Sequence, residues 1–198
     1  MIKIVKSFFV VFAVITIAVL TTGAFLSDSE TSSGNSFTAG TWTPGPAKIV
    51  EVYYDPVEPG SDSGLEFIKI KNVGTYYINL NNYLLHHSES GSNDYIFGNV
   101  NLAPGAIITV DSFVDNMNDI HGSVSLFKNA TKNVANILDF VRYGYLAGAE
   151  NMESNAVIAG IWTLGDFVPD VATGHSIKLS GNDNNVSSDW IENITPGL

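Results

Sequence analysis

The sequence contains no cysteine, and basic residues are scarce beside acidic ones. The absence of cysteine excludes disulfide bonds and thiolate chemistry, so the apolar core must hold the fold together. Acidic residues outnumber basic ones by 20 to 9, which gives a formal net charge of −11. Such a charge repels nucleic acid and anionic lipid, so we expect neither as a partner. It suits a soluble protein outside the cell, although colloidal solubility alone accounts for it.

Local catalytic signatures are also absent. The chain has no G-x-S-x-G, no H-E-x-x-H and no phosphate-cradling glycine-rich loop. We therefore predict no catalytic residue, no cofactor and no resident metal. The chain does have 198 residues, 45% of them hydrophobic and eleven of them phenylalanine, which is enough to fill the core of one domain.

Residues 1–24 have the pattern of a secretory signal peptide. Lys3 and Lys6 form a positive start, and residues 7–20 form an apolar run of 14, which is short for a membrane span. Small residues follow, so we predict cleavage between Ala24 and Phe25. The alternative is an uncleaved anchor, which would be the only contact with a membrane.

Residues 25–46 are polar and rich in serine and threonine, with too few apolar residues to fold alone. Two interpretations stay open: a flexible linker, or a strand that pairs with this domain or a neighbouring copy. Two prolines and a glycine close the segment and exclude a central strand there. We expect one domain over residues 47–198.

The segments 48–54 and 66–72 alternate as strands of a half-buried antiparallel sheet do. In the first, Val50, Val52 and Tyr54 should share one face, opposite Glu51. In the second, isoleucines 68 and 70 should face away from lysines 69 and 71. The prediction is an all-β fold.

Later segments extend this pattern. We expect a strand buried on both faces at 107–110, a hairpin within 123–144, and one or two helical turns within 146–159. His86 and His87 should point to opposite faces of a strand and lie at the surface. The oxygen-rich runs 115–119 and 182–185 could suggest Ca²⁺ loops, but they lack the full EF-hand pattern, and we interpret them as solvated turns.

Several motifs together resemble the lamin tail domain. The opening of that family matches Val50-Glu51-Val52, Gly64, Glu66-Phe67-Ile68 and Ile70-Lys71-Asn72, although Val50 replaces the usual Asn and Lys69 the usual second Glu. Later matches are Leu102-Ala103-Pro104-Gly105, Asp139, Tyr143-Gly144, and the closing Asp189-Trp190 and Thr195-Pro196-Gly197. The resemblance covers about residues 47–198. It implies an immunoglobulin-like antiparallel β-sandwich, non-catalytic, with structural roles for Glu51, Glu66, Asn72, Asp139 and Trp190.

The segment 25–42 is similar to the start of mature TasA/camelysin-type exported proteins, whose leader is of the SipW type. Phe25, Asp28, Glu30, Asn35 and Phe37 fit that pattern, and Leu26 is an insertion. The resemblance implies a bacterial or archaeal host. In some relatives with this leader the mature N-terminus builds fibres.

Three functions follow as hypotheses. The first is a non-catalytic module, secreted or at the cell surface, that binds a protein or the cell envelope. The second is a fibre subunit that self-assembles through residues 25–42. The third is a cation-dependent binding protein, with Ca²⁺ as its cofactor, or a hydrolase, using Glu51 and Glu66 on adjacent strands.

Overall fold

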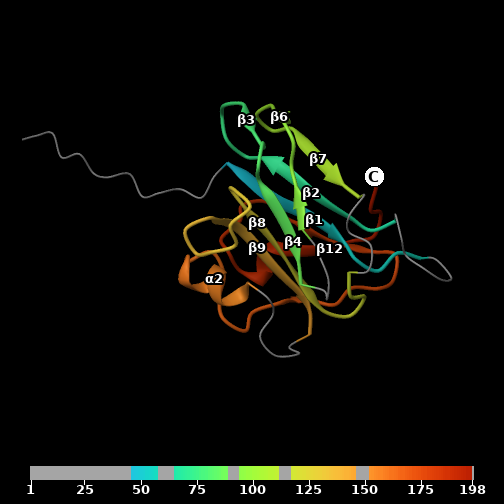
Figure 1. The fold of residues 1–198 in the computed structure, drawn as a ribbon. Coiled ribbons are helices and arrows are strands. Elements are labelled where there is room, and N and C mark those ends of the chain that lie inside the picture. The colour runs from blue at the N-terminus through green and yellow to red at the C-terminus, as the bar shows by residue number, and fades with distance from the viewer. Residues whose placement is uncertain (1–45, 58–64, 89–93, 112–116, 146–151, 198) are drawn as a thin grey trace, which may run out of the picture. The chain divides into compact units, whose positions relative to one another are not determined.

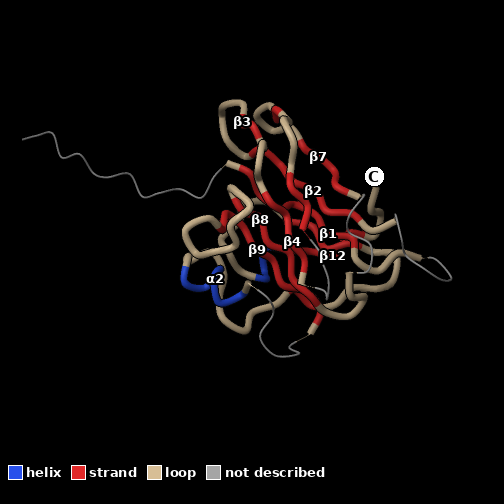
Figure 2. The backbone as a smooth tube through the Cα atoms, viewed as in Figure 1, coloured by secondary structure: helices blue, strands red, loops and turns tan. Residues whose placement is uncertain are grey.

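Two five-stranded sheets that face each other make up most of the regular structure (Figures 1 and 2). The computed structural model describes residues 46–57, 65–88, 94–111, 117–145 and 152–197. The predicted leader, its cleavage site and residues 25–45 lie outside these ranges. All described residues belong to one unit, 43–198.

The first sheet is antiparallel and has the strand order β12-β11-β1-β2-β7. Its strands, in chain order, are β1 (Ala47–Tyr53), β2 (Phe67–Asn72), β7 (Ile107–Val110), β11 (Ser176–Leu179) and β12 (Trp190–Asn193). Strands far apart in the chain thus lie side by side, because β1 pairs with both β2 and β11.

The second sheet has the order β10-β9-β8-β4-β5. Its strands are β4 (Leu84–His87), β5 (Asp94–Ile96), β8 (Gly122–Phe127), β9 (Ile137–Gly144) and β10 (Val168–Pro169). Only the short β10 runs parallel to its neighbour, β9. The all-β fold predicted from strand alternation, and the antiparallel sandwich that the resemblance implies, are confirmed.

Three small elements complete the described structure. A two-stranded ribbon pairs β3 (Ile78–Asn79) with β6 (Asn101–Leu102). The helix α2 (Glu153–Ile158) lies within the segment for which helical turns were predicted, and the 3-10 turn η1 (Ser187–Asp189) precedes β12. Among the described residues, no helix has both the length and the apolar character needed to cross a membrane.

A β-bulge in β1 changes which of its residues face the core. The register with β2 shifts between Ile49 and Glu51, so Ile49 pairs with Ile70 and Glu51 pairs with Lys69. Ile49 and Val52 are both fully buried, whereas Val50 is half-buried. The prediction that Val50 and Val52 share one face was wrong, because the extra residue in a bulge breaks the period of two. The predicted alternation in β2 is confirmed: Ile68 and Ile70 are fully buried.

The three central strands of the second sheet are buried on both faces, since every residue of β4, β8 and β9 is buried. On the inner face, Tyr143 of β9 stacks on Tyr54 at a centroid distance of 4.0 Å. On the outer face, Phe140 meets the ring of Trp162 edge-on at 5.5 Å. The chain around α2 therefore covers this sheet, and the fold has a third layer over β9.

The prediction that β7 is buried on both faces was wrong. β7 is an edge strand of the first sheet, and its residue Ile107 is 52% exposed. A continuous apolar run does not by itself separate a central strand from an edge strand.

Gly144, at the end of β9, has a backbone that other residues rarely adopt, with φ +92°. A Cβ atom there would lie 1.9 Å from the carbonyl oxygen of Ile120. We expect Gly144→Ala to lower the free energy of unfolding by more than about 3 kcal/mol, measured by chemical denaturation. The matched control is Gly181→Ala, because Gly181 has φ +107° and no atom within 4 Å of the added Cβ. It should lose only about 1–2 kcal/mol, and equal losses would contradict this account of Gly144.

Candidate functional site

Glu51 holds four strands of the first sheet together. Its Oε1 accepts hydrogen bonds from Ser176 Oγ and Asn193 Nδ2, both at 2.7 Å. Its Oε2 accepts from Lys69 Nζ at 3.0 Å, and the same ammonium donates to the backbone oxygen of Gly197. The carboxylate is 4% exposed. Both oxygens therefore accept hydrogen bonds from residues of β2, β11 and β12. The side chain of Glu51 thus links its own strand, β1, to the other three.

Glu66 lies just before β2 and is fully buried. Its Oε2 accepts a hydrogen bond from the backbone N–H of Met117 at 3.1 Å. The loop that follows β7 is thereby tied to the start of β2.

The structure does not bring Glu51 and Glu66 together. The register places Glu51 opposite Lys69, which is three residues from Glu66. An odd separation along a strand directs side chains to opposite faces. The two carboxylates that the cation or hydrolase hypothesis needs therefore serve separate contacts.

Asn72 closes β2 and arranges the loop after it. Its Nδ2 donates to the backbone oxygens of Tyr76 and Leu102 at 2.8 and 2.9 Å. Its Oδ1 accepts from Gly74 N–H at 2.9 Å, and the side chain is fully buried. One amide thus fixes the loop 73–77 against β6.

Asp139 connects the two sheets. Its Oδ2 accepts from Ile49 N–H at 2.7 Å, and its Oδ1 accepts from Lys48 Nζ at 3.1 Å. β11 pairs with β1 only at Glu51 and Val52. Beyond that point, Asp139 of β9 supplies the acceptor that a neighbouring strand would otherwise provide.

Burial raises the pKa of Asp139 to about 6, against the attraction of Lys48. Lys48 is shared with Asp183, whose carboxylate lies 2.5 Å from its Nζ and adds like-charge repulsion. Burial by itself would lower the pKa of Lys48, but the two carboxylates outweigh it and raise that pKa. The turn at 182–185 thus binds a lysine of the chain itself.

Trp190, the first residue of β12, is 7% exposed and belongs to the hydrophobic core. Its place opposite Leu179 in the ladder seals the β11–β12 end of that core.

The prediction that His86 and His87 lie at the surface was wrong, because their exposures are 4% and 1%. His86 Nδ1 lies 2.7 Å from Asp94 Oδ1, and Lys132 Nζ lies 2.9 Å from Asp94 Oδ2. Partial burial would raise the pKa of Asp94, but the bonds from Lys132 and His86 outweigh it and lower that pKa. Sequence alternation could not show this burial, since it depends on β4 lying between β5 and β8 within the second sheet.

Ser125 stands opposite His86 in the ladder, so Asp94, His86 and Ser125 have the residue types of a catalytic triad. The geometry does not match. Ser125 Oγ is buried and makes no hydrogen bond to the described residues. A serine nucleophile needs a hydrogen bond to its base and access to substrate.

Arg142 and Glu153 form an ion pair that sequence reasoning missed. Arg142 Nη1 donates to Glu153 Oε2 at 2.9 Å, and both side chains are 1% exposed. Glu153 Oε1 also accepts from Gly165 N–H at 2.8 Å. The pair fastens α2 and the loop after it to β9. Within the described ranges, no three His, Asp or Glu side chains are arranged to hold a metal ion.

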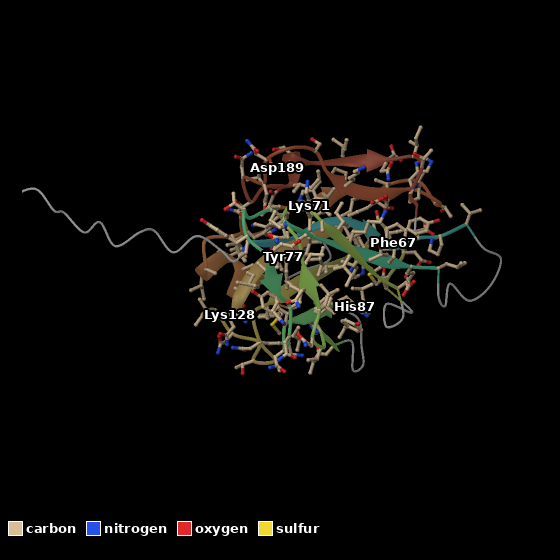
Figure 3. The ribbon with its side chains drawn as sticks, turned by 90° about the horizontal axis from the view of Figure 1, so that it is seen from above. Phe67, Lys71, Tyr77, His87, Lys128 and Asp189 are labelled. Atoms are coloured by element: carbon tan, nitrogen blue, oxygen red, sulfur yellow. The ribbon has the colours of Figure 1, made fainter. Side chains whose placement is uncertain are left out.

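The two most exposed of the described aromatic side chains lie at one end, which we call the tip: residues 72–83 together with 95–107. The two segments are joined by the β3–β6 pair and by Leu80 N–H, which donates to Val100 O at 2.8 Å. Tyr76 and Tyr77 are 81% and 74% exposed. Figure 1 shows β3 and β6 side by side, and in Figure 3 this end faces the viewer, with Tyr77 labelled.

The raised pKa of Asp139 predicts a pH dependence of stability. Its folded pKa of about 6 exceeds the unfolded value of about 3.9, so its contribution is complete below about pH 4 and is lost as pH rises through 6. The free energy of unfolding of the native protein minus that of Asp139→Asn should fall by about 2–3 kcal/mol over that range. Urea denaturation at a series of pH values measures it.

Asp94→Asn provides a control of opposite sign. Because the folded pKa of Asp94 is lowered, its contribution is present at neutral pH and is lost as pH falls through the folded pKa. A flat difference profile for Asp139→Asn would contradict the raised pKa.

Comparison with family models, with curated proteins and with solved structures found no match for this chain. The resemblances to the lamin tail domain and to a SipW-type leader therefore stay predictions. What the geometry offers is a sandwich whose motif carboxylates are buried and bonded, and a tip whose large side chains face solvent.

Proposed function

We propose that this chain is an exported, non-catalytic β-sandwich that acts by contact at the cell surface or in the extracellular matrix. The proposal joins the predicted leader to the exposed aromatic tip. The tip carries the argument, because exposed tyrosines next to other apolar side chains are typical of interaction surfaces.

The apolar part of the tip extends beyond the two tyrosines. Val73 is 51% exposed and Ile107 is 52% exposed. These residues are neighbours, because Asn72 exchanges backbone hydrogen bonds with Gly105 and Ala106 at 2.8 and 3.0 Å. A folded chain gains nothing from holding such side chains in water, which supports a binding role for this end.

The motif carboxylates support the same proposal because their side chains are already used inside the sandwich. Glu51, Glu66 and Asp139 are 3%, 0% and 3% exposed, and each bonds groups of the sandwich itself. To act on a substrate, each would have to give up contacts that hold strands together. We therefore assign them to stability and the tip to function.

Envelope binding tests this proposal. Isolated envelopes of the producing cells should sediment the purified protein, and the double variant Tyr76→Ser/Tyr77→Ser should bind at least about tenfold more weakly. Tyr145→Ser is the matched control, because Tyr145 is 48% exposed but lies at the end of β9. Failure of the native protein to sediment, or equal binding by the double variant, would refute the proposal.

A second candidate, a fibre subunit, is favoured by the edge strand β7. Ile107–Val110 carries no charged residue, and protein edges that stay unpaired are usually protected by charge or proline. We place residues 25–42 of a second copy along β7, since that segment is uncharged from Thr31 to Trp42.

A charge on this edge should stop such assembly. Ile107→Lys should abolish concentration-dependent growth in size, measured by light scattering. Ile191→Lys should not, although Ile191 is 51% exposed on β12 at the opposite edge of the same sheet. If the native protein stays monomeric at all concentrations, or if both variants assemble alike, pairing along β7 is excluded.

A further inference from the structure

We infer that the tip binds an uncharged glycan chain. This rests on the contact function proposed above and names the chemical class of the partner.

The tip lacks charge in a strongly acidic protein. Neither 72–83 nor 95–107 contains Asp, Glu, Lys or Arg, although the chain carries 29 such residues. An anionic or cationic polymer would find no countercharge on these segments, and the net charge of −11 repels anions further. The chemistry therefore favours a neutral ligand.

The ring of Tyr77 and the amides of Asn79 and Asn101 stand on the same side of the ribbon. Ile78 and Leu102 pair on the buried side, whereas Asn79 and Asn101 pair on the exposed side. Tyr77 is two residues before Asn79, so on extended backbone it shares that side. An exposed ring beside carboxamides suits a sugar, because the ring accepts the C–H face of a pyranose and the amides bond its hydroxyls.

The amides are already ordered. Asn79 Nδ2 donates to Asn99 Oδ1 at 2.6 Å and to Asn101 Oδ1 at 3.0 Å. These bonds engage the NH2 group of Asn79 and the oxygens of Asn99 and Asn101, and so hold the three amides in place relative to one another. Asn72 fixes the loop carrying Tyr76 through the backbone oxygen of that residue. Little conformational freedom would be lost on binding.

A protein partner is less well matched. Stable protein interfaces bury about 800 Å² on each side around an apolar centre, and here the aromatic surface is two side chains bordered by an amide ladder. Surfaces of tyrosine and asparagine also make adaptable polar contacts, which suits the repeated hydroxyls of a polysaccharide.

The test uses the full chain and isolated envelopes of the producing cells. Mild periodate oxidation, which cleaves vicinal diols of sugars, should reduce binding at least tenfold, and protease treatment of the envelopes should leave it unchanged. If binding survives periodate and is lost after protease, the partner is a protein and the inference falls. Envelope binding would then still support the proposed contact function.

Purified polysaccharides give a second arm. In native gels, at least one of dextran, mannan and β-glucan should retard the protein, and the effect should persist at high salt. Tyr76→Ala/Tyr77→Ala should lose it, and Tyr145→Ala should keep it. Retardation by the anionic polymers alginate or hyaluronate alone would overturn the inference if high salt weakens it. The same holds if Lys71→Gln weakens it, because Lys71 lies opposite Ile107. Equal retardation of the tyrosine variant would also overturn it.

Discussion

The hydrogen bond from the backbone of Ile49 to the carboxylate of Asp139 is the contact on which the sandwich depends. A chain without cysteine cannot join facing sheets covalently, and apolar packing has no direction. Asp139 of β9, in the second sheet, accepts a hydrogen bond from Ile49 of β1, in the first, and this directional bond orients the two sheets. The bond is placed where β11 stops pairing with β1, so one carboxylate both ends a ladder and sets the position of the sheets.

The same arrangement recurs at the other buried carboxylates. Glu51 joins strands across the first sheet, Glu66 ties down the loop after β7, and Glu153 holds the third layer over β9. Each is buried and accepts at least one hydrogen bond from the sandwich itself, as burial of a charge requires. These buried acidic groups thus serve internal order, whereas the tip, with its exposed tyrosines, carries no charged residue.

Local patterns were enough for part of this structure. The alternation in 66–72 predicted the buried isoleucines of β2, and the helical turns within 146–159 were placed correctly as far as that segment is described. Non-local contacts were not predictable. His86 is buried and bonded to Asp94 of the neighbouring strand β5, and the face on which Val50 lies follows from one extra residue in β1. Likewise, nothing local marks β7 as an edge. The tip could not be predicted without the β3–β6 pairing, which joins its two segments. Only the absence of charged residues from each segment could be read directly from the sequence.

The bonds of Glu51 also bear on how the domain is made. Its partners Ser176 and Asn193 follow it by 125 and 142 residues. Because β1 cannot complete its sheet before these strands exist, a growing chain cannot close the first sheet until residue 193 has been made. The first sheet therefore forms through contacts between residues far apart in the chain, which makes its folding slow compared with that of a sheet built from local hairpins.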